Sequence, residues 1–223
     1  MPQSTLTTFP REIQINEIVH VVDDDPQIQN LFRQLGRQED FAIATYDAAK
    51  PFLQTFSDSS QGCLVLDLHL PDISGLDVLH ELASRNSKVP VIFMSGIASV
   101  ADAVRALKLG SLDFVEKPFP IADMSAAIRR ALVADRTRRK QTRDAEACKA
   151  RIANLTAREF EVMQLVVMGL ANKTIASRLD VSPKTVEVHR AHVMQKTMSA
   201  SLAELVKIAM VAGVTTPPAP VRS

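Results

Sequence analysis

Short apolar runs alternate with helical patterns through roughly the first half of the chain. Four runs, at residues 18–22, 63–66, 91–94 and 114–115, are mostly apolar, partly β-branched, and followed by polar residues or by Gly or Pro. A weaker run covers residues 41–46. Runs of this length and composition are typical of strands buried in a parallel sheet, so the pattern predicts five such strands.

Between these runs, apolar side chains recur every three or four residues, as they do on one face of a helix. The clearest sets are Ile28, Leu31, Phe32 and Leu35, then Leu76, Leu79 and Leu82, then Val100, Val104 and Leu107. Strand and helix therefore alternate along the chain. This order predicts an α/β fold, a doubly wound five-stranded parallel sheet with helices on both faces and right-handed crossovers.

The second half of the chain is helical by the same criterion. No Gly or Pro interrupts residues 122–153, which as one helix would be roughly 48 Å long at about 1.5 Å per residue. The first half of this helix can pack on the sheet, whereas the second half has only a thin apolar stripe among many charges. Short helices with N-terminal capping signals follow. The signals are Thr156 with Glu159, Asn172, Ser182 before Pro183, and Ser201 with Glu204.

These patterns divide the chain into five segments. We expect an N-terminal extension (1–15), an α/β domain (16–121), a helical linker (122–153), an all-α four-helix domain (154–212) and a Pro-rich, disordered tail (213–223). The length of 223 residues and the hydrophobic content of 46% are sufficient for two packed cores.

Charge is distributed unevenly, although the formal net charge is only +1. Acidic residues gather near the N-terminus, as at 23–25, whereas Arg and Lys crowd residues 129–143. One end of the chain is therefore expected to bind a cation and the other a polyanion.

The cysteines and the apolar runs indicate the cellular compartment in which we expect the protein. Cys63 and Cys148 have no partners at ligand spacing, so neither a zinc site nor a disulfide framework is indicated. The chain does not begin with a signal-peptide pattern, and no apolar run approaches the roughly 20 residues that span a bilayer. We therefore expect a cytoplasmic protein with reduced thiols and no membrane partner.

Polar residues follow the predicted strands, at the sheet edge where open α/β sheets bind ligands. Asp23 and Asp24 follow the first strand, Asp67 the third, Ser95 the fourth and Lys117 the fifth. Three converging carboxylates repel each other unless a hard cation, Mg²⁺ or another divalent ion, lies among them. A carboxylate beside such an ion can attack a phosphoryl group, with the Lys117 ammonium neutralising the charge on its oxygens.

Each of these residues also has a plainer interpretation. Residues 23–25 can form a solvated turn in which Asp25 caps the helix that Pro26 opens. Lys117 can be a surface lysine, and Ser95 an ordinary serine at the end of a strand.

The chain contains four motifs at these strand ends: VVDDDP at 21–26, LVLDLHLPDISG at 64–75, FMSG at 93–96 and FVEKPF at 114–119. Together they resemble the flavodoxin-like receiver domains of two-component systems. The resemblance covers residues 18–121 and implies the following roles. Asp67 is the phosphoacceptor, Asp23 and Asp24 are the acidic pair, the backbone carbonyl of His69 completes the Mg²⁺ ligands, Lys117 contacts the phosphoryl group, and Ser95 and Phe114 form the switch pair. The loop at 96–99 lacks the polar residues that many relatives carry there.

Residues 155–197 resemble the helix-turn-helix of LuxR-type regulators of the FixJ and NarL subfamily. Asp180, Val181 and Ser182 make the turn, and the helix at 183–197 is expected to enter the major groove of DNA. The residues expected at the DNA are Lys173, Thr174, Lys184, Thr185, Glu187, Val188, His189, Arg190, Ala191 and Lys196. Packing or solvent exposure is an equal alternative for His189.

The two resemblances together imply a transcriptional regulator rather than an enzyme. Its partners would be a sensor histidine kinase, promoter DNA, RNA polymerase and, on phosphorylation, a second copy of the chain. A phosphatase of the haloacid dehalogenase type is disfavoured because His69 stands where that class has a second acid. A protein-docking or RNA-binding role of the C-terminal helices is disfavoured by the capped helix-turn-helix.

Overall fold

The computed structural model describes residues 17–57, 59–96 and 100–214. The chain divides into two compact units, Met1–Arg138 and Arg139–Ser223. The expected N-terminal extension (1–15), most of the expected tail and loop residues 97–99 lie outside the described residues.

The first unit contains one five-stranded sheet in which every strand pair is parallel. The strands are β1 (Ile18–Val22), β2 (Ala42–Tyr46), β3 (Gly62–Asp67), β4 (Val91–Ser95) and β5 (Asp113–Glu116), in the order β2-β1-β3-β4-β5. In the register of this sheet Asp67 lies beside Met94, and Ser95 lies beside Glu116. The predicted sheet is confirmed, and its carboxyl edge brings the polar strand ends together.

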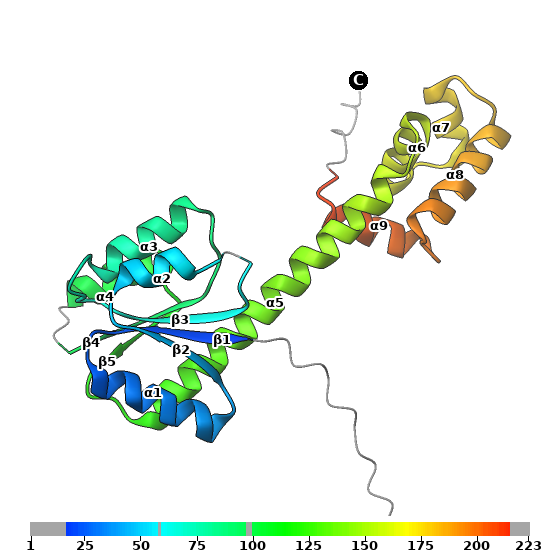
Figure 1. The fold of residues 1–223 in the computed structure, drawn as a ribbon. Helices are drawn as coiled ribbons and strands as arrows, with labels where there is room; N and C mark the ends of the chain where they lie inside the picture. Colours follow the sequence, from blue (N-terminus) through cyan, green and yellow to red (C-terminus); the bar gives the residue numbers. More distant parts are fainter. Residues whose placement is uncertain (1–16, 58, 97–99, 215–223) are drawn as a thin grey trace, which may run out of the picture. The chain divides into compact units, whose positions relative to one another are not determined.

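Helices cover both faces of the sheet (Figure 1). They are α1 (Pro26–Glu39), α2 (Ala49–Thr55), α3 (Gly75–Ser84), α4 (Val100–Lys108) and α5 (Ile121–Ala153). Within the first unit, α2, α3 and α4 lie on one face, and α1 and the first half of α5 lie on the other. The single helix expected at 122–153 is present and begins one residue earlier, at Ile121.

Two apolar layers hold these helices to the sheet. Phe32 of α1 and Ile128 of α5 are fully buried against one face, and Phe52 of α2 and Val78 of α3 against the other. Cys63 of β3 is also fully buried, and burial raises the pKa of its thiol. Each of these helices buries one face against the sheet, which explains why its apolar residues recur every three or four positions in the sequence.

The second unit contains the end of α5 and four short helices around a single core. They are α6 (Ala157–Val167), α7 (Asn172–Leu179), α8 (Pro183–Thr197) and α9 (Leu202–Val211). Both helices of the helix-turn-helix contribute to this core, in which Ile175 and Ala176 of α7 and Val186 and Val193 of α8 are all buried. Asp180 ends α7 in the left-handed region, with φ of 52°, and thereby makes the predicted turn.

Most of the predicted helix caps are present. Thr156 and Glu159 form a complete capping box, and Ser182 accepts a hydrogen bond of 3.0 Å from the Thr185 N–H. The prediction that Asn172 caps α7 is wrong. Ala171 is the N-cap and Asn172 is the first helical residue, because the chain enters the helix one residue earlier. The Asn172 side chain instead accepts a hydrogen bond of 3.1 Å from Arg190.

No helix in the part of the chain that the structure describes combines the length and the apolarity that a membrane span requires.

Candidate metal centre and nucleic-acid interface

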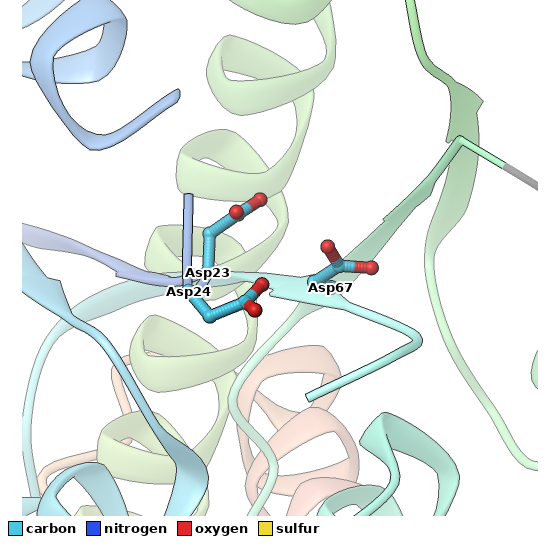
Figure 2. A group of neighbouring side chains, drawn as sticks. All are labelled: Asp23, Asp24 and Asp67. Atoms are coloured by element: carbon cyan, nitrogen blue, oxygen red, sulfur yellow. The ribbon is translucent and has the colours of Figure 1, made fainter. Parts of the chain in front are cut away.

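Three carboxylates converge at the carboxyl edge of the sheet (Figure 2). Asp23 and Asp24 come directly after β1, and Asp67 is the last residue of β3. One carboxylate oxygen from each lies within 4.8 Å of the others. Asp23 and Asp67 are buried and Asp24 is exposed, so the cluster has one side open to solvent.

Lys117, just past β5, joins the two buried carboxylates. Its Nζ donates hydrogen bonds of 2.5 Å to Asp23 Oδ2 and 2.6 Å to Asp67 Oδ2. The other oxygens accept from backbone N–H groups, Asp23 Oδ1 from Asp25 at 2.9 Å and Asp67 Oδ1 from His69 at 3.1 Å. Lys117 is therefore part of the pocket and not a surface lysine, as the plainer interpretation would have it.

The environment of the pocket shifts two of its pKa values. Burial raises the pKa of Asp23 above its usual value, although the hydrogen bonds from Lys117 and the Asp25 N–H act in the opposite direction. Burial alone would lower the pKa of Lys117, but its hydrogen bonds to Asp23 and Asp67 outweigh burial and raise it. Lys117 therefore stays charged at neutral pH.

The donor set fits a hard divalent cation. All three side chains offer carboxylate oxygens, the ligands that Mg²⁺ prefers, and the exposed position of Asp24 leaves room for the waters that Mg²⁺ retains. When all three carboxylates are ionised, the single Lys117 ammonium leaves two negative charges, which one divalent cation balances. The role of the His69 carbonyl as a further ligand stays a prediction.

The predicted switch residues lie on the neighbouring strands. Ser95 is fully buried, and its Oγ lies 3.4 Å from Nδ1 of the exposed His69 side chain. Phe114 of β5 is half-buried and packs against the apolar layer beneath α2, α3 and α4. Ser95 therefore lies at the carboxyl edge of the sheet, whereas Phe114 lies within β5, paired with Phe93. The switching role of both residues stays a prediction.

Asp72, in the loop after β3, and Gly75, the first residue of α3, position this edge of the sheet in ways that the sequence did not reveal. A Cβ at Gly75 would lie 2.3 Å from the Asp67 carbonyl oxygen, so only glycine lets α3 begin this close to the phosphoacceptor candidate. Asp72 accepts hydrogen bonds from the N–H groups of Ala49 (3.1 Å) and Lys50 (2.8 Å) and so caps α2. Burial opposes the lowering of the Asp72 pKa, but these backbone hydrogen bonds outweigh it.

In the second unit, α8 exposes one face and buries the other. Lys184, Glu187, Val188 and Ala191 are exposed and lie at helical spacings of three and four residues, so their side chains share one face. Lys173 and Thr174, at the start of α7, are exposed as well, and Thr185 is half-buried. This face is the one expected in the major groove.

Two of the residues expected at DNA, Lys196 and Arg190, also have polar contacts within the unit. Lys196 Nζ lies 2.6 Å from Oε2 of the buried Glu159, and Arg190 donates to Asn172. His189 Nδ1 is buried without a hydrogen-bond partner in the part of the chain that the structure describes. The hydrogen bond from Lys196, assisted by the Thr156 N–H, lowers the pKa of Glu159 to about 2. Lys196 and Arg190 thus support the helix packing, whatever they do at DNA.

Two known families match this chain, one in each of its two units. Residues 19–129 match the response regulator receiver domain, and residues 153–209 match the bacterial regulatory proteins of the luxR family. The chain belongs to the two-component response regulators with a LuxR-type DNA-binding domain. This response regulator is therefore a transcriptional regulator, and the DNA-binding interpretation of its C-terminal helices is confirmed over the docking alternative.

Relatives extend over nearly the whole of this response regulator. The transcriptional regulatory protein FixJ of Azorhizobium caulinodans is 43% identical over 88% of this chain and 93% of its own length. FixJ of Rhizobium meliloti is 40% identical over 87% of this chain and 96% of its own. The response regulator StyR aligns with a TM-score of 0.79 and 35% identity over 88% of this chain and 99% of its own. Full-length FixJ from B. japonicum aligns with a TM-score of 0.56, 37% identity and coverage of 89% and 98%.

Proposed function

We propose that this response regulator accepts a phosphoryl group on Asp67 from a sensor histidine kinase and then binds promoter DNA through α8. The observation that carries the proposal is the position of Lys117, whose ammonium touches Asp67 and Asp23 at the open end of the sheet. In this proposal residues 16–121 receive the signal, residues 122–153 link, and residues 154–212 read DNA.

The residues around Asp67 suit phosphoryl transfer. One carboxylate oxygen of Asp67 attacks phosphorus, forming an O–P bond while the P–N bond to the kinase histidine breaks and the electron pair leaves with the imidazole. Lys117 neutralises charge on the phosphoryl oxygens from its place 2.6 Å from Asp67 Oδ2. Asp23, Asp24 and Asp67, with the His69 carbonyl, would hold Mg²⁺, which would supply further positive charge when bound.

Ser95 and Phe114 are proposed to transmit the modification. The Ser95 hydroxyl, now 3.4 Å from His69 Nδ1, would instead donate to a phosphoryl oxygen on Asp67. Movement of β4 at Ser95 would make room for the half-buried Phe114 ring to turn inward. Phosphorylation would thereby reshape the face formed by the last two strands of the sheet.

The exposed face of α8 is proposed to read bases, and flanking residues to hold phosphates. Lys184 stands at the start of α8 and Lys173 at the start of α7, so ammonium groups and helix N-termini can act together on the DNA backbone. Two copies of the chain would bind a two-fold site and act with RNA polymerase. We place this activity in the cytoplasm, where promoter DNA is accessible.

The variant Asp67→Asn tests the proposal directly. With acetyl phosphate and Mg²⁺, we expect the wild-type chain to gain one phosphoryl group and the variant to gain none, because the amide is not a nucleophile. Intact-mass spectrometry measures the uptake. Asp25→Asn is the matched control, since Asn caps α1 as Asp25 does and the residue lies outside the carboxylate cluster. Stable phosphoryl uptake by Asp67→Asn would show that Asp67 is not the acceptor.

A further inference from the structure

A cavity of about 500 Å³ lies at the amino ends of β4 and β5. Its walls come from the end of α3, the loop that follows it, the loop between α4 and β5, and Ala134 and Arg138 of α5. The acidic cluster stands at the carboxyl ends of the same parallel strands, so the two sites occupy opposite edges of the sheet. The cavity therefore takes no part in phosphoryl chemistry.

Most of the wall is apolar, but two serines interrupt it. Leu79, Leu82 and Leu112 contribute apolar surface. The hydroxyl oxygens of Ser87 and Ser111 are buried and have no hydrogen-bond partner among the described residues. Ser111 as a whole is only 8% exposed. Buried hydroxyls without partners are uncommon and destabilising, so a pair of them beside one cavity indicates a missing acceptor.

The charge on the wall has one sign. Lys88 and Arg138 line the cavity, and none of the lining residues within the described chain is acidic. Asp135, which accepts a hydrogen bond from the Arg138 guanidinium, belongs to α5 but not to the lining. A ligand with a negative group is therefore favoured over a neutral or cationic one.

We propose that this cavity binds a small organic acid, in which one carboxylate is joined to an apolar body. The body would lie against the leucines, and rotation about the Cα–Cβ bonds would turn the hydroxyls of Ser87 and Ser111 toward the carboxylate. Lys88 and Arg138 would supply the charge complement. The cavity volume falls within the roughly 300–1,000 Å³ of typical small-molecule sites.

Three probes separate the contributions of charge and apolar surface. Octanoate carries both, octanol carries the same apolar body without the charge, and acetate carries the charge alone. We expect octanoate to bind the full-length protein at least tenfold more tightly than either of the others. Titrations followed by amide nuclear magnetic resonance should show shifts around Ser87 and Ser111. Absence of octanoate binding there would mean that the cavity holds only water, and would overturn the proposal.

Two variants test the polar groups. Ser111→Ala should weaken octanoate binding about tenfold, as expected for a lost hydrogen bond to a charged group, while leaving thermal stability equal or higher because an unpartnered hydroxyl is removed. Lys88→Gln, at an exposed position, should also weaken binding, and Lys108→Gln, an exposed lysine of α4 outside the lining, should not. Unchanged binding in Ser111→Ala, or equal effects of the two lysine variants, would contradict the proposal.

Discussion

The three carboxylates of the acidic pocket differ in burial and in their contact with Lys117. Asp23 and Asp67 share the Lys117 ammonium, whereas the third carboxylate, on Asp24, is exposed at the pocket mouth. Replacing Asp24 should therefore remove a proposed cation ligand without leaving a buried group unpaired. That separation makes Asp24 the residue at which cation binding can be tested apart from folding.

Asp24→Asn is expected to lower Mg²⁺ affinity at least tenfold, because a charged oxygen ligand becomes a neutral one. Binding of Mg²⁺ to the folded pocket should raise the thermal midpoint of the wild-type protein, and the variant should require correspondingly more Mg²⁺ for the same rise. Differential scanning calorimetry with and without a chelator measures both. Asp25→Asn, next in the chain and outside the cluster, should behave as wild type. Equal losses in the two variants would argue against a cation among the three carboxylates.

His20 is expected to make the stability of the receiver depend on pH. Its side chain is buried on β1 among Tyr46, Phe52 and Phe56, and burial lowers its pKa from 6.5 to about 4. The unfolded chain therefore binds a proton that the folded chain excludes, and the free energy of unfolding falls as pH drops from about 6.5 toward 4. This group alone should cost roughly 2 kcal/mol between pH 7 and pH 5.

Chemical denaturation followed by circular dichroism at pH 7 and pH 5 measures that loss. His20→Phe keeps an aromatic ring in the cluster and cannot take up a proton, so its free energy of unfolding should change less over the same interval. His80→Gln removes an exposed histidine of α3 and should retain the full dependence. The assignment fails if His20→Phe is as sensitive to pH as the wild-type chain.

At the scale of elements, the sequence predicted what depends on periodicity and missed what depends on distant contacts. The strands were readable as short continuous apolar runs, as in β3, where every residue from Gly62 to Asp67 is buried. The long helix was readable because no Gly or Pro interrupts it. The cap on α2 was not readable, because Asp72 lies 23 residues from Ala49 and only folding brings them together. The Asn172 prediction failed because capping preference does not fix the residue at which a helix begins.

In the candidate sites too, residues placed by strand order could be predicted from the sequence, and contacts between distant elements could not. Asp23, Asp67 and Lys117 could be found because parallel strands end at one edge, and the structure brings all three into contact. The contact of Lys196 with Glu159 could not, because it joins α8 to the capping box of α6. A lysine on a recognition helix looks the same in sequence whether it binds phosphate or a buried carboxylate.

Helix α8 is the element whose charge is expected to set DNA affinity. Lys184→Gln should weaken binding to specific and random duplexes alike and reduce the slope of log K against log salt by about 0.9, the contribution of one phosphate contact. Fluorescence anisotropy with labelled duplexes at several salt concentrations measures the slope. Lys207→Gln, at an exposed position on α9 outside the expected contact set, is the control. If both variants change the slope equally, α8 is not the principal DNA-binding element.

The whole molecule is expected to couple its two units through self-association. Phosphorylation of Asp67 should shift the chain from monomer to dimer, and the dimer should select promoter fragments with paired half-sites about 34 Å, or a multiple of that, apart. Analytical ultracentrifugation and selection of genomic fragments, each with and without acetyl phosphate and Mg²⁺, measure the two effects. Asp67→Asn should respond in neither. Equal fragment enrichment before and after phosphorylation would show that DNA binding is not under receiver control.

The burial of Cys63 gives the protein a built-in reporter of receiver opening. A thiol reacts with alkylating reagents as the thiolate, and the raised pKa and complete burial of Cys63 prevent that reaction while β3 stays in the sheet. Cys148, the other free cysteine, is half-buried and lies in the second unit. The folded chain therefore offers a maleimide one accessible thiol, and a second label marks a molecule whose sheet has come apart.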